Sequence, residues 1–262
     1  MPGSLTGRTI AVTGAAGFIG SRVVARLASG AGRVIRVARG ALPRIEDARA
    51  SVIDVIGDVT DRATWEEVAD ADIVFHFAAQ TGESSAADDA DASFHANVMP
   101  IRHLRAVCGE RRRRPTVVFA GTATEAGIPT RLPVNEDQPD APVTAYDRHK
   151  LMAENDLKAA AADGAICGAT QRLSNVYGPG AAGKGRDRDV LNRMIKAALG
   201  GEPLTVYASG AYLRDYVFVE DVVDAFLEAA DHAANINGRH FIVGSGRGVS
   251  IRGAVELISA RV

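Results

Sequence analysis

Two side chains that can exchange a proton, Tyr146 and Lys150, lie four residues apart near the start of the Ala-rich stretch Ala145–Ala162. Residues at positions i and i+4 share one face of a helix, so the phenol and the ammonium group can both reach one ligand. A free tyrosine has a pKa of about 10, and a nearby cation favours the phenolate, which lowers that pKa toward the working range of an acid–base catalyst. The pair therefore predicts acid–base chemistry at the start of a helix.

A glycine-rich segment, residues 14–20, follows a short β-branched run and precedes another helical stretch. Glycines at such a junction allow a tight turn, let the backbone approach a pyrophosphate and let the helix pack against the strand, while free amides at the helix start bind the anion. The segment therefore predicts a dinucleotide site within the first 20 residues. The expected contacts are Gly14, Gly17, Phe18, Ile19 and Gly20.

Elements that could position these groups follow from the alternation of β-branched runs with Ala-rich stretches. We expect strands at Thr9–Thr13, Arg33–Val37, Ser51–Ile56, Ile73–Phe77, Thr116–Ala120 and Ala165–Leu173. The expected helices are Phe18–Ala28, Ala63–Ala69, His95–Cys108, Ala145–Ala162, Asp189–Leu199, Glu220–Asp231 and Ile251–Val262. This alternation is typical of a parallel sheet with helices on both faces, so the predicted fold class is α/β, a Rossmann-type doubly wound parallel sheet.

Gly and Pro become frequent after residue 174, which indicates irregular loops and a change of lobe. We expect a dinucleotide-binding domain over residues 1–174, to which residues 215–234 return. Residues 175–214 and 235–262 are expected to form a small C-terminal lobe that binds the substrate.

The composition excludes several classes of protein. The chain has 262 residues, of which 47% are hydrophobic and 24% charged, and its net charge is −2. It can therefore bury a core, and it lacks both the signature of disorder and the basic charge of a nucleic-acid binder. The basic run Arg111–Arg114 has no interleaved aromatic residues and is interpreted as a solvated loop.

Metal and membrane sites are not expected either. The two cysteines do not cluster with histidine, and the six histidines show no ligand spacing. No apolar run approaches the roughly 20 residues that span a bilayer, and the N-terminus has no signal peptide. We therefore expect a cytoplasmic protein with no metal and with no membrane or nucleic-acid partner.

Several motifs together resemble the extended short-chain dehydrogenase/reductase family of nucleotide-sugar epimerases, dehydratases and reductases, over nearly the whole chain. They are Gly-x-x-Gly-x-x-Gly at residues 14–20, Gly57–Asp61, Phe75–Gln80, Tyr146–Glu154, Arg172–Gly180 and Leu213–Val222. The resemblance implies that Tyr146 exchanges a proton with the sugar oxygen and that Lys150 also holds the nicotinamide ribose. The cofactor contacts that it further implies are Asp58 and Val59 near the adenine, and Ala78 and Ala79 at the end of a strand.

The resemblance also implies a third catalytic group, a hydroxyl at the end of the fifth strand, where this chain has Thr122. The 4,6-dehydratases carry an Asp-Glu pair directly after this residue, whereas this chain has Ala123 and Thr124, as many 4-epimerases and simple ketoreductases do. The implied substrate contacts are Thr124, Asn175 at the diphosphate and Arg214, whose planar bidentate donor suits the phosphates.

The choice between NAD and NADP depends on the end of the second strand, where an acidic residue would accept hydrogen bonds from the ribose 2′-OH of NAD. Here that position is Ala38, and Arg39 follows it. Because a guanidinium can pair with a 2′-phosphate, we expect NADP(H), with NAD(H) as the alternative.

These features favour an NAD(P)-dependent oxidoreductase that acts on a nucleotide-activated sugar, first of all a 4-ketoreductase in which Tyr146 supplies the proton and Thr122 steadies the oxygen. A nucleotide-sugar 4-epimerase with tightly bound NAD is the alternative, because it uses the same groups. A catalytically idle dinucleotide-sensing regulator is a further alternative, although such proteins tend to lose the Tyr–Lys pair. The family implies a homodimer through the helices around 95–108 and 145–162, and its usual length implies a short or truncated substrate lobe.

Overall fold

Seven parallel strands form the main sheet of the computed structural model, which describes residues 5–30, 32–81, 87–179, 190–206 and 208–262. The strand order is β3-β2-β1-β4-β5-β6-β9. The bounds are β1 Thr9–Thr13, β2 Arg33–Ala38, β3 Ser51–Ile56, β4 Ile73–His76, β5 Thr116–Thr122, β6 Cys167–Leu173 and β9 His240–Val243. Most of the central strands are buried on both faces, which explains why they consist of nearly continuous apolar runs.

The chain starts in the middle of this sheet. β1 pairs with β2 on one side and with β4 on the other. The strand order therefore reverses next to β1, and the connections after β1 and β4 run over opposite faces of the sheet, which leaves a crevice at the carboxyl ends of these strands. This arrangement confirms the Rossmann-type doubly wound sheet that the sequence predicts.

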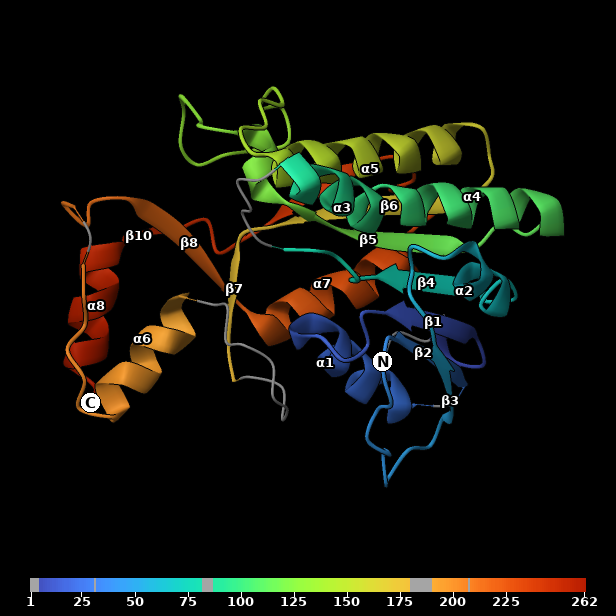
Figure 1. Cartoon of the computed structure of the whole chain (residues 1–262), viewed down its shortest axis with the longest axis horizontal. Helices are drawn as coiled ribbons and strands as arrows, with labels where there is room; N and C mark the ends of the chain where they lie inside the picture. Colours follow the sequence, from blue (N-terminus) through green and yellow to red (C-terminus); the bar gives the residue numbers. More distant parts are fainter. Residues whose placement is uncertain (1–4, 31, 82–86, 180–189, 207) are drawn as a thin grey trace.

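Helices cover both faces of the main sheet (Figure 1). On one face lie α1 (Phe18–Ala28) and α7 (Val219–Asp231), and on the other lie α2 (Arg62–Glu67), α3 (Ala87–Asn97), α4 (Met99–Arg111) and α5 (Ala145–Ala162). Phe75 and Phe226 belong to the core of the first face, and Phe119 and Leu157 to the core of the second. In the part of the chain that the structure describes, no helix combines the length and the apolar character needed to cross a membrane.

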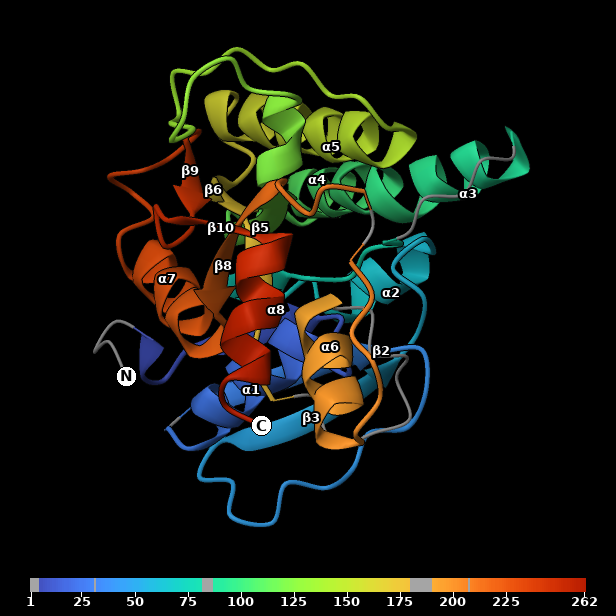
Figure 2. The ribbon, with the colours of Figure 1, turned by 90° about the vertical axis from the view of Figure 1, so that its left-hand side faces the viewer.

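A second, smaller region lies beside the main sheet and is called the second region below (Figures 1 and 2). It contains the three-stranded sheet β10-β8-β7 and two helices, with bounds β7 Asn175–Tyr177, β8 Leu213–Phe218, β10 Gly248–Ser250, α6 Val190–Leu199 and α8 Ile251–Ser259. α6 and α8 lie side by side (Figure 2). α6 buries no side chain, and α8 buries only Ala254 and Ile258. Asp189, expected as the first residue of the helix at α6, lies outside the described residues.

The predicted division into two domains stays a prediction, and two strands bear on its limits. β9 falls within residues 235–262 but pairs with β6 in the main sheet. β8 pairs with β7 and β10, although most of it falls within residues 215–234. A boundary that followed the two sheets would place β9 with the first domain and β8 with the second.

One expected helix, His95–Cys108, is divided in two. α3 ends at Asn97 and α4 begins at Met99, with Val98 between them. Pro100 explains the break, because proline lacks the N–H that would continue the first helix and is favoured in the first turn of the next one. The prediction of a single helix over this segment is therefore wrong.

Candidate functional site

The residues predicted to bind the cofactor gather at one edge of the main sheet. Because its strands are parallel, their carboxyl ends lie at the same edge, and ligands of open α/β sheets bind there. The glycine segment follows β1, Arg39 follows β2, Asp58 and Val59 follow β3, Ala78 and Ala79 follow β4, and Thr122 ends β5. Tyr146 and Lys150 lie in the first two turns of α5.

Gly14 and Gly20 make the tight turn between β1 and α1 possible. Gly14 has φ +66°, and a Cβ there would lie 2.8 Å from the backbone nitrogen of Ala78. A Cβ on Gly20 would lie 2.3 Å from the carbonyl oxygen of Gly14. Both positions therefore require glycine for the strand, the helix and the end of β4 to approach one another.

Gly17 precedes α1 and leaves the start of that helix open. No side chain caps α1, no acidic residue lies in its first turn, and Gly17 is exposed. The backbone N–H groups of Phe18, Ile19 and Gly20 have no acceptor within the helix, so an anion can bind them without competition from a carboxylate. This open helix start fits the pyrophosphate of a dinucleotide.

The residues expected around the adenosine differ in their present contacts. Arg39 is exposed. The carboxylate of Asp58 accepts the backbone N–H of Thr60 at 2.9 Å, and the carbonyl oxygen of Val59 accepts the indole N–H of Trp65 at 2.8 Å. Asp58 thus shapes the turn after β3 through one oxygen and keeps a second oxygen that a ligand could use.

Hydrogen bonds connect the predicted catalytic hydroxyl to the start of α5. The Oγ1 atoms of Thr122 and Thr124 lie 2.8 Å apart, and the Thr124 hydroxyl donates to the carboxylate of Asp147 at 2.5 Å. Asp147 in turn accepts the backbone N–H of Thr144, the residue that caps α5. Since Asp147 follows Tyr146 directly, these bonds fix the end of β5 beside the turn that carries the phenol.

Burial controls the protonation of the two groups on α5. Lys150 is 2% exposed, and its ammonium lies 3.9 Å from the centre of the Phe119 ring. This burial lowers the pKa of Lys150, whereas burial and the carboxylates of Glu125 and Asp147 raise the pKa of Tyr146 above its usual range. The direction predicted for the pKa of Tyr146 is therefore reversed in the structure.

His76, at the end of β4, adds no charge to this interior. Its Nδ1 lies 2.6 Å from the hydroxyl of Thr13, and its ring stacks on Phe119 with the centroids 5.7 Å apart. Burial, followed by the charge of Lys150, lowers the pKa of His76 to about 3. The imidazole is therefore neutral at physiological pH.

A buried group of charges that was not predicted from the sequence lies behind these residues. Arg172 on β6 donates through Nε and Nη2 to the two carboxylate oxygens of Glu154, at 2.9 and 2.6 Å. Its Nη1 donates to Asp140 at 2.7 Å, and its Nε also lies 3.2 Å from Glu125. Arg172, Glu125 and Glu154 are almost fully buried.

Two signals in the sequence could have indicated this group. Glu154 follows Lys150 by four residues, so it continues the helix face that carries Tyr146 and Lys150. Arg172 is the only charged residue in the strand Cys167–Leu173, and a charge in a buried strand requires a partner.

Two of the three predicted substrate contacts, Asn175 and Arg214, lie on the second region, whereas Thr124 follows β5 of the main sheet. Asn175 on β7 donates its side-chain amide to the carbonyl oxygen of Asp215, at 3.1 Å, on the neighbouring strand β8. Arg214, also on β8, is exposed, and its guanidinium donates to the carbonyl oxygen of Leu213. Among the described residues Arg214 forms no ion pair with a carboxylate, so its charge is available to an anionic ligand.

One set of side chains within the described residues has the spacing of metal ligands. Glu228, Asp231 and His232, at the end of α7, place ligand atoms within 4.8 Å of one another. None of them is a predicted site residue, and the expectation that the chain binds no metal stays a prediction.

A family model of the NAD-dependent epimerase/dehydratase family matches residues 10–244 of the chain. The chain belongs to this family. The matched segment includes the glycine turn, Thr122, Tyr146, Lys150 and Arg214, and it confirms the resemblance drawn from the motifs.

Similar proteins include several 4-epimerases. The UDP-glucose 4-epimerase of Azospirillum brasilense is 31% identical over 267 aligned positions, gaps included, and the alignment covers 95% of this chain and 76% of that protein. The dTDP-L-rhamnose 4-epimerase of Burkholderia thailandensis is 27% identical over 97% of this chain and 81% of its own.

Solved structures agree with these matches. The structure of MoeE5 in complex with UDP-glucose and NAD superimposes with a TM-score of 0.85 and 29% identity, and the match covers 97% of this chain and 82% of that one. The UDP-glucose 4-epimerase from Brucella ovis in complex with NAD gives a TM-score of 0.79 and 28% identity, over 95% of this chain and 81% of its own.

Proposed function

We propose that this protein is a nucleotide-sugar 4-epimerase that uses a nicotinamide dinucleotide. The observation that carries the proposal is the connected arrangement of Thr122 with the helix turn of Tyr146 and Lys150, beside a glycine turn that is open to an anion. Curated relatives and a structural neighbour are 4-epimerases, which supports this function over the ketoreductase that the sequence alone favours.

When bound, the dinucleotide would supply the acceptor, and then the donor, of one hydride at C4 of the sugar. In its phenolate form, Tyr146 would take the proton of the 4-hydroxyl as the hydride leaves, and it would return that proton after the keto sugar has turned over in the site. Thr122 would turn its hydroxyl, which bonds Thr124 in the structure, to donate a hydrogen bond to the reacting oxygen. Lys150 would hold the nicotinamide ribose. One proton and one hydride leave and return, so the reaction needs no other reactant.

Residues of the second region, together with Thr124 of the main sheet region, would hold the substrate. The exposed guanidinium of Arg214 suits a diphosphate because it offers two parallel donors. Asn175 lies on the neighbouring strand β7, opposite Tyr216, which follows Arg214 by two residues. Thr124 is exposed beside Thr122, so its hydroxyl can contact the sugar.

The exposed Arg39, which follows Ala38, favours a second candidate, an NADPH-dependent nucleotide-sugar 4-ketoreductase. A guanidinium at this place can pair with the 2′-phosphate of NADP, and no acidic residue stands there to bind the ribose of NAD. In that reaction Tyr146 would donate its proton once, to the carbonyl oxygen that becomes the new hydroxyl, and the cofactor would leave oxidised.

The dinucleotide bound to the purified protein, together with its activity, distinguishes these two candidates. Denaturation of an epimerase is expected to release close to one NAD per chain, and the native protein should interconvert UDP-glucose and UDP-galactose, or another pair of 4-epimers, without added cofactor. A protein that releases no dinucleotide, quenches NADPH fluorescence and reduces a 4-keto nucleotide sugar would contradict the epimerase and support the reductase. Dinucleotide binding with neither activity would favour the regulator.

The homodimer through the helices α4 and α5 also stays a prediction. The outer surfaces of these helices carry the ion pairs Arg102–Asp156 and Arg105–Asp163, which join the two helices within one chain. Sedimentation of the purified protein, with and without charge reversal at Arg105, would test it.

A further inference from the structure

Glu125 is a buried carboxyl beside the predicted catalytic residues, and the proposed reaction does not use it. We infer that Glu125 is a positioning residue of this site, which holds Thr122 by its backbone N–H and, by gaining or losing a proton, shifts the pH range in which Tyr146 and Lys150 work. The inference deepens the proposed function and rests on it for the roles of these residues, but its first test needs neither substrate nor cofactor.

The first observation is how the Glu125 side chain is held. It is fully buried beneath the short 3₁₀ helix Ala123–Ala126, and its Oε1 accepts the backbone N–H of Thr122 at 2.9 Å. Gly121 leaves the room for this oxygen, because a Cβ there would lie 3.0 Å from it. One oxygen of Glu125 therefore fixes the backbone of the residue that carries the catalytic hydroxyl.

The second observation is that the other oxygen of Glu125 has no hydrogen-bond partner among the residues that the structure describes. Its Oε2 lies 3.2 Å from Nε of Arg172, but it forms no hydrogen bond. Arg172 is already engaged by both oxygens of Glu154, which also accepts from Lys158 at 2.6 Å, and by Asp140. Glu154 is therefore the better compensated of the two carboxylates, and Glu125 is the less compensated one.

When two buried carboxylates share one guanidinium, keeping both of them charged costs free energy through desolvation and mutual repulsion. A proton on one of them removes the repulsion and the desolvation cost, and the site with an unpaired oxygen is the one that takes it. Burial, and then the charge of Glu154, raise the pKa of Glu125 to about 8, whereas hydrogen bonds from Arg172 and Lys158 lower the pKa of Glu154 despite its burial. Glu125 therefore exchanges its proton near neutral pH.

This proton affects the groups that face Glu125. They are Arg172 from β6, with Asp140 on its far side, and Tyr146, Lys150 and Glu154 from α5. A negative charge on Glu125 raises the pKa of Tyr146 and of Lys150, so both hold their protons more firmly. A neutral Glu125 makes both easier to deprotonate.

The variant Glu125→Gln separates charge from position, since its amide oxygen can still accept the N–H of Thr122. An acid whose pKa is higher in the folded than in the unfolded protein binds more protons when the protein is folded. Its contribution to stability therefore falls as the pH rises from the pKa of the unfolded state, about 4.3, through the pKa of the folded state. The wild type suffers this loss and the variant does not. We expect the melting temperature of the variant, relative to wild type, to rise by at least about 3 °C between about pH 5 and about pH 8.

Glu136→Gln is the matched control. Glu136 also accepts a backbone N–H, from Ile242 at 2.8 Å, but its carboxylate is exposed to water. The difference in melting temperature between Glu136→Gln and the wild type is expected to stay constant over the same pH range. A constant difference for Glu125→Gln as well would overturn the proposal, because it would mean that Glu125 carries no proton in this range.

The pH profile of kcat/KM tests the effect on the catalytic groups. The acidic limb of Glu125→Gln, along which Tyr146 loses its proton and becomes able to act as a base, is expected to shift by about one pH unit toward lower pH, because Tyr146 no longer faces a charge. A rising melting-temperature difference with an unchanged profile would overturn the proposed role. If the wild type turned over no nucleotide sugar, the proposed function would fail, while the melting temperatures would still show whether Glu125 holds a proton.

A measurement on the wild-type protein keeps the test valid if Glu125→Gln does not fold. Carboxyl carbon-13 resonances of labelled glutamate should include one that titrates near pH 8. A spectrum in which every glutamate resonance titrates in the acidic range would contradict the inference.

Discussion

In the main sheet, the groups proposed to do chemistry are held from several sides, whereas in the second region the groups proposed to hold the substrate lie at the surface. Lys150 is buried, as is Arg172 in the group of charges behind it, and Thr122 is bonded at its backbone and at its hydroxyl. Asn175 and Arg214 are exposed, and the helix α6 buries no side chain at all. Substitutions should therefore affect stability in the first region and substrate binding in the second.

The largest effect is expected at Arg172, and Arg214 is its counterpart in the second region. Arg172→Met leaves three carboxylates without their guanidinium, so the free energy of unfolding should fall by about 3–5 kcal/mol in denaturant titrations. Arg214→Met should change it by less than about 0.5 kcal/mol, and instead raise the KM for the nucleotide sugar with little change in kcat. Equal losses of stability would remove the contrast between the regions.

Two leucines, one in each region, allow the same comparison of stability with uncharged side chains. Leu157 on α5 is 0% exposed and Leu199 at the end of α6 is 69% exposed. Leu157→Ala should lower the free energy of unfolding by about 2–5 kcal/mol, through lost burial and the remaining cavity, while Leu199→Ala should change it by less than about 0.5 kcal/mol. A cost above about 1 kcal/mol at Leu199 would show that α6 is covered in solution.

Two glycines with similar backbone angles, one in each region, allow a comparison of what an added Cβ costs in stability. Gly14 has φ +66° and Gly246 has φ +71°, but a Cβ at Gly246 would meet nothing within 4 Å. Gly246→Ala should cost about 1 kcal/mol of stability from backbone strain alone. Gly14→Ala should cost more, because its Cβ overlaps Ala78, and it should also weaken dinucleotide binding, which fluorescence titration measures.

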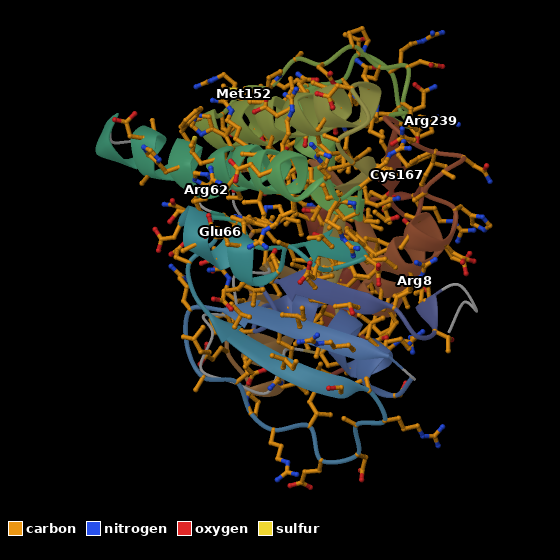
Figure 3. All side chains as sticks on the ribbon, turned by 90° about the vertical axis from the view of Figure 1, so that its right-hand side faces the viewer. Arg8, Arg62, Glu66, Met152, Cys167 and Arg239 are labelled. Carbon is orange, nitrogen blue, oxygen red and sulfur yellow. The ribbon has the colours of Figure 1, made fainter. Side chains whose placement is uncertain are left out.

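The smallest effect is expected at an exposed ion pair of the main sheet region. Arg62 and Glu66 lie next to each other on the surface of α2 (Figure 3), and the pair is solvated. Glu66→Gln should leave the melting temperature unchanged within error. A clear drop would mean that position in the main sheet region, rather than burial, decides which residues matter.

The sequence predicts the elements that position the catalytic groups better than those of the second region. The helices Phe18–Ala28 and Ala145–Ala162 begin and end at the expected residues, because a glycine turn and the capping Thr144 mark their starts. The strands β7, β8, β9 and β10 were not predicted, since they have three to six residues and no clear apolar alternation.

The chemistry of the site was predictable only in part, for a physical reason. Motifs place Thr122, Tyr146 and Lys150 at strand and helix ends, and local rules are enough for that. The partners Glu125 and Arg172 are 47 positions apart and meet only through the sheet. Burial likewise depends on tertiary packing, which is why the direction of the Tyr146 pKa was predicted incorrectly.

The substitution Tyr146→Phe tests the central claim most directly, since it removes one hydroxyl from the protein. With the nucleotide sugar that the wild type turns over, kcat should fall by at least about 100-fold, because the proton loses its carrier. The melting temperature and the amount of bound dinucleotide should stay at wild-type values. Unchanged turnover by Tyr146→Phe would contradict the assignment of this phenol, and with it the account of the site.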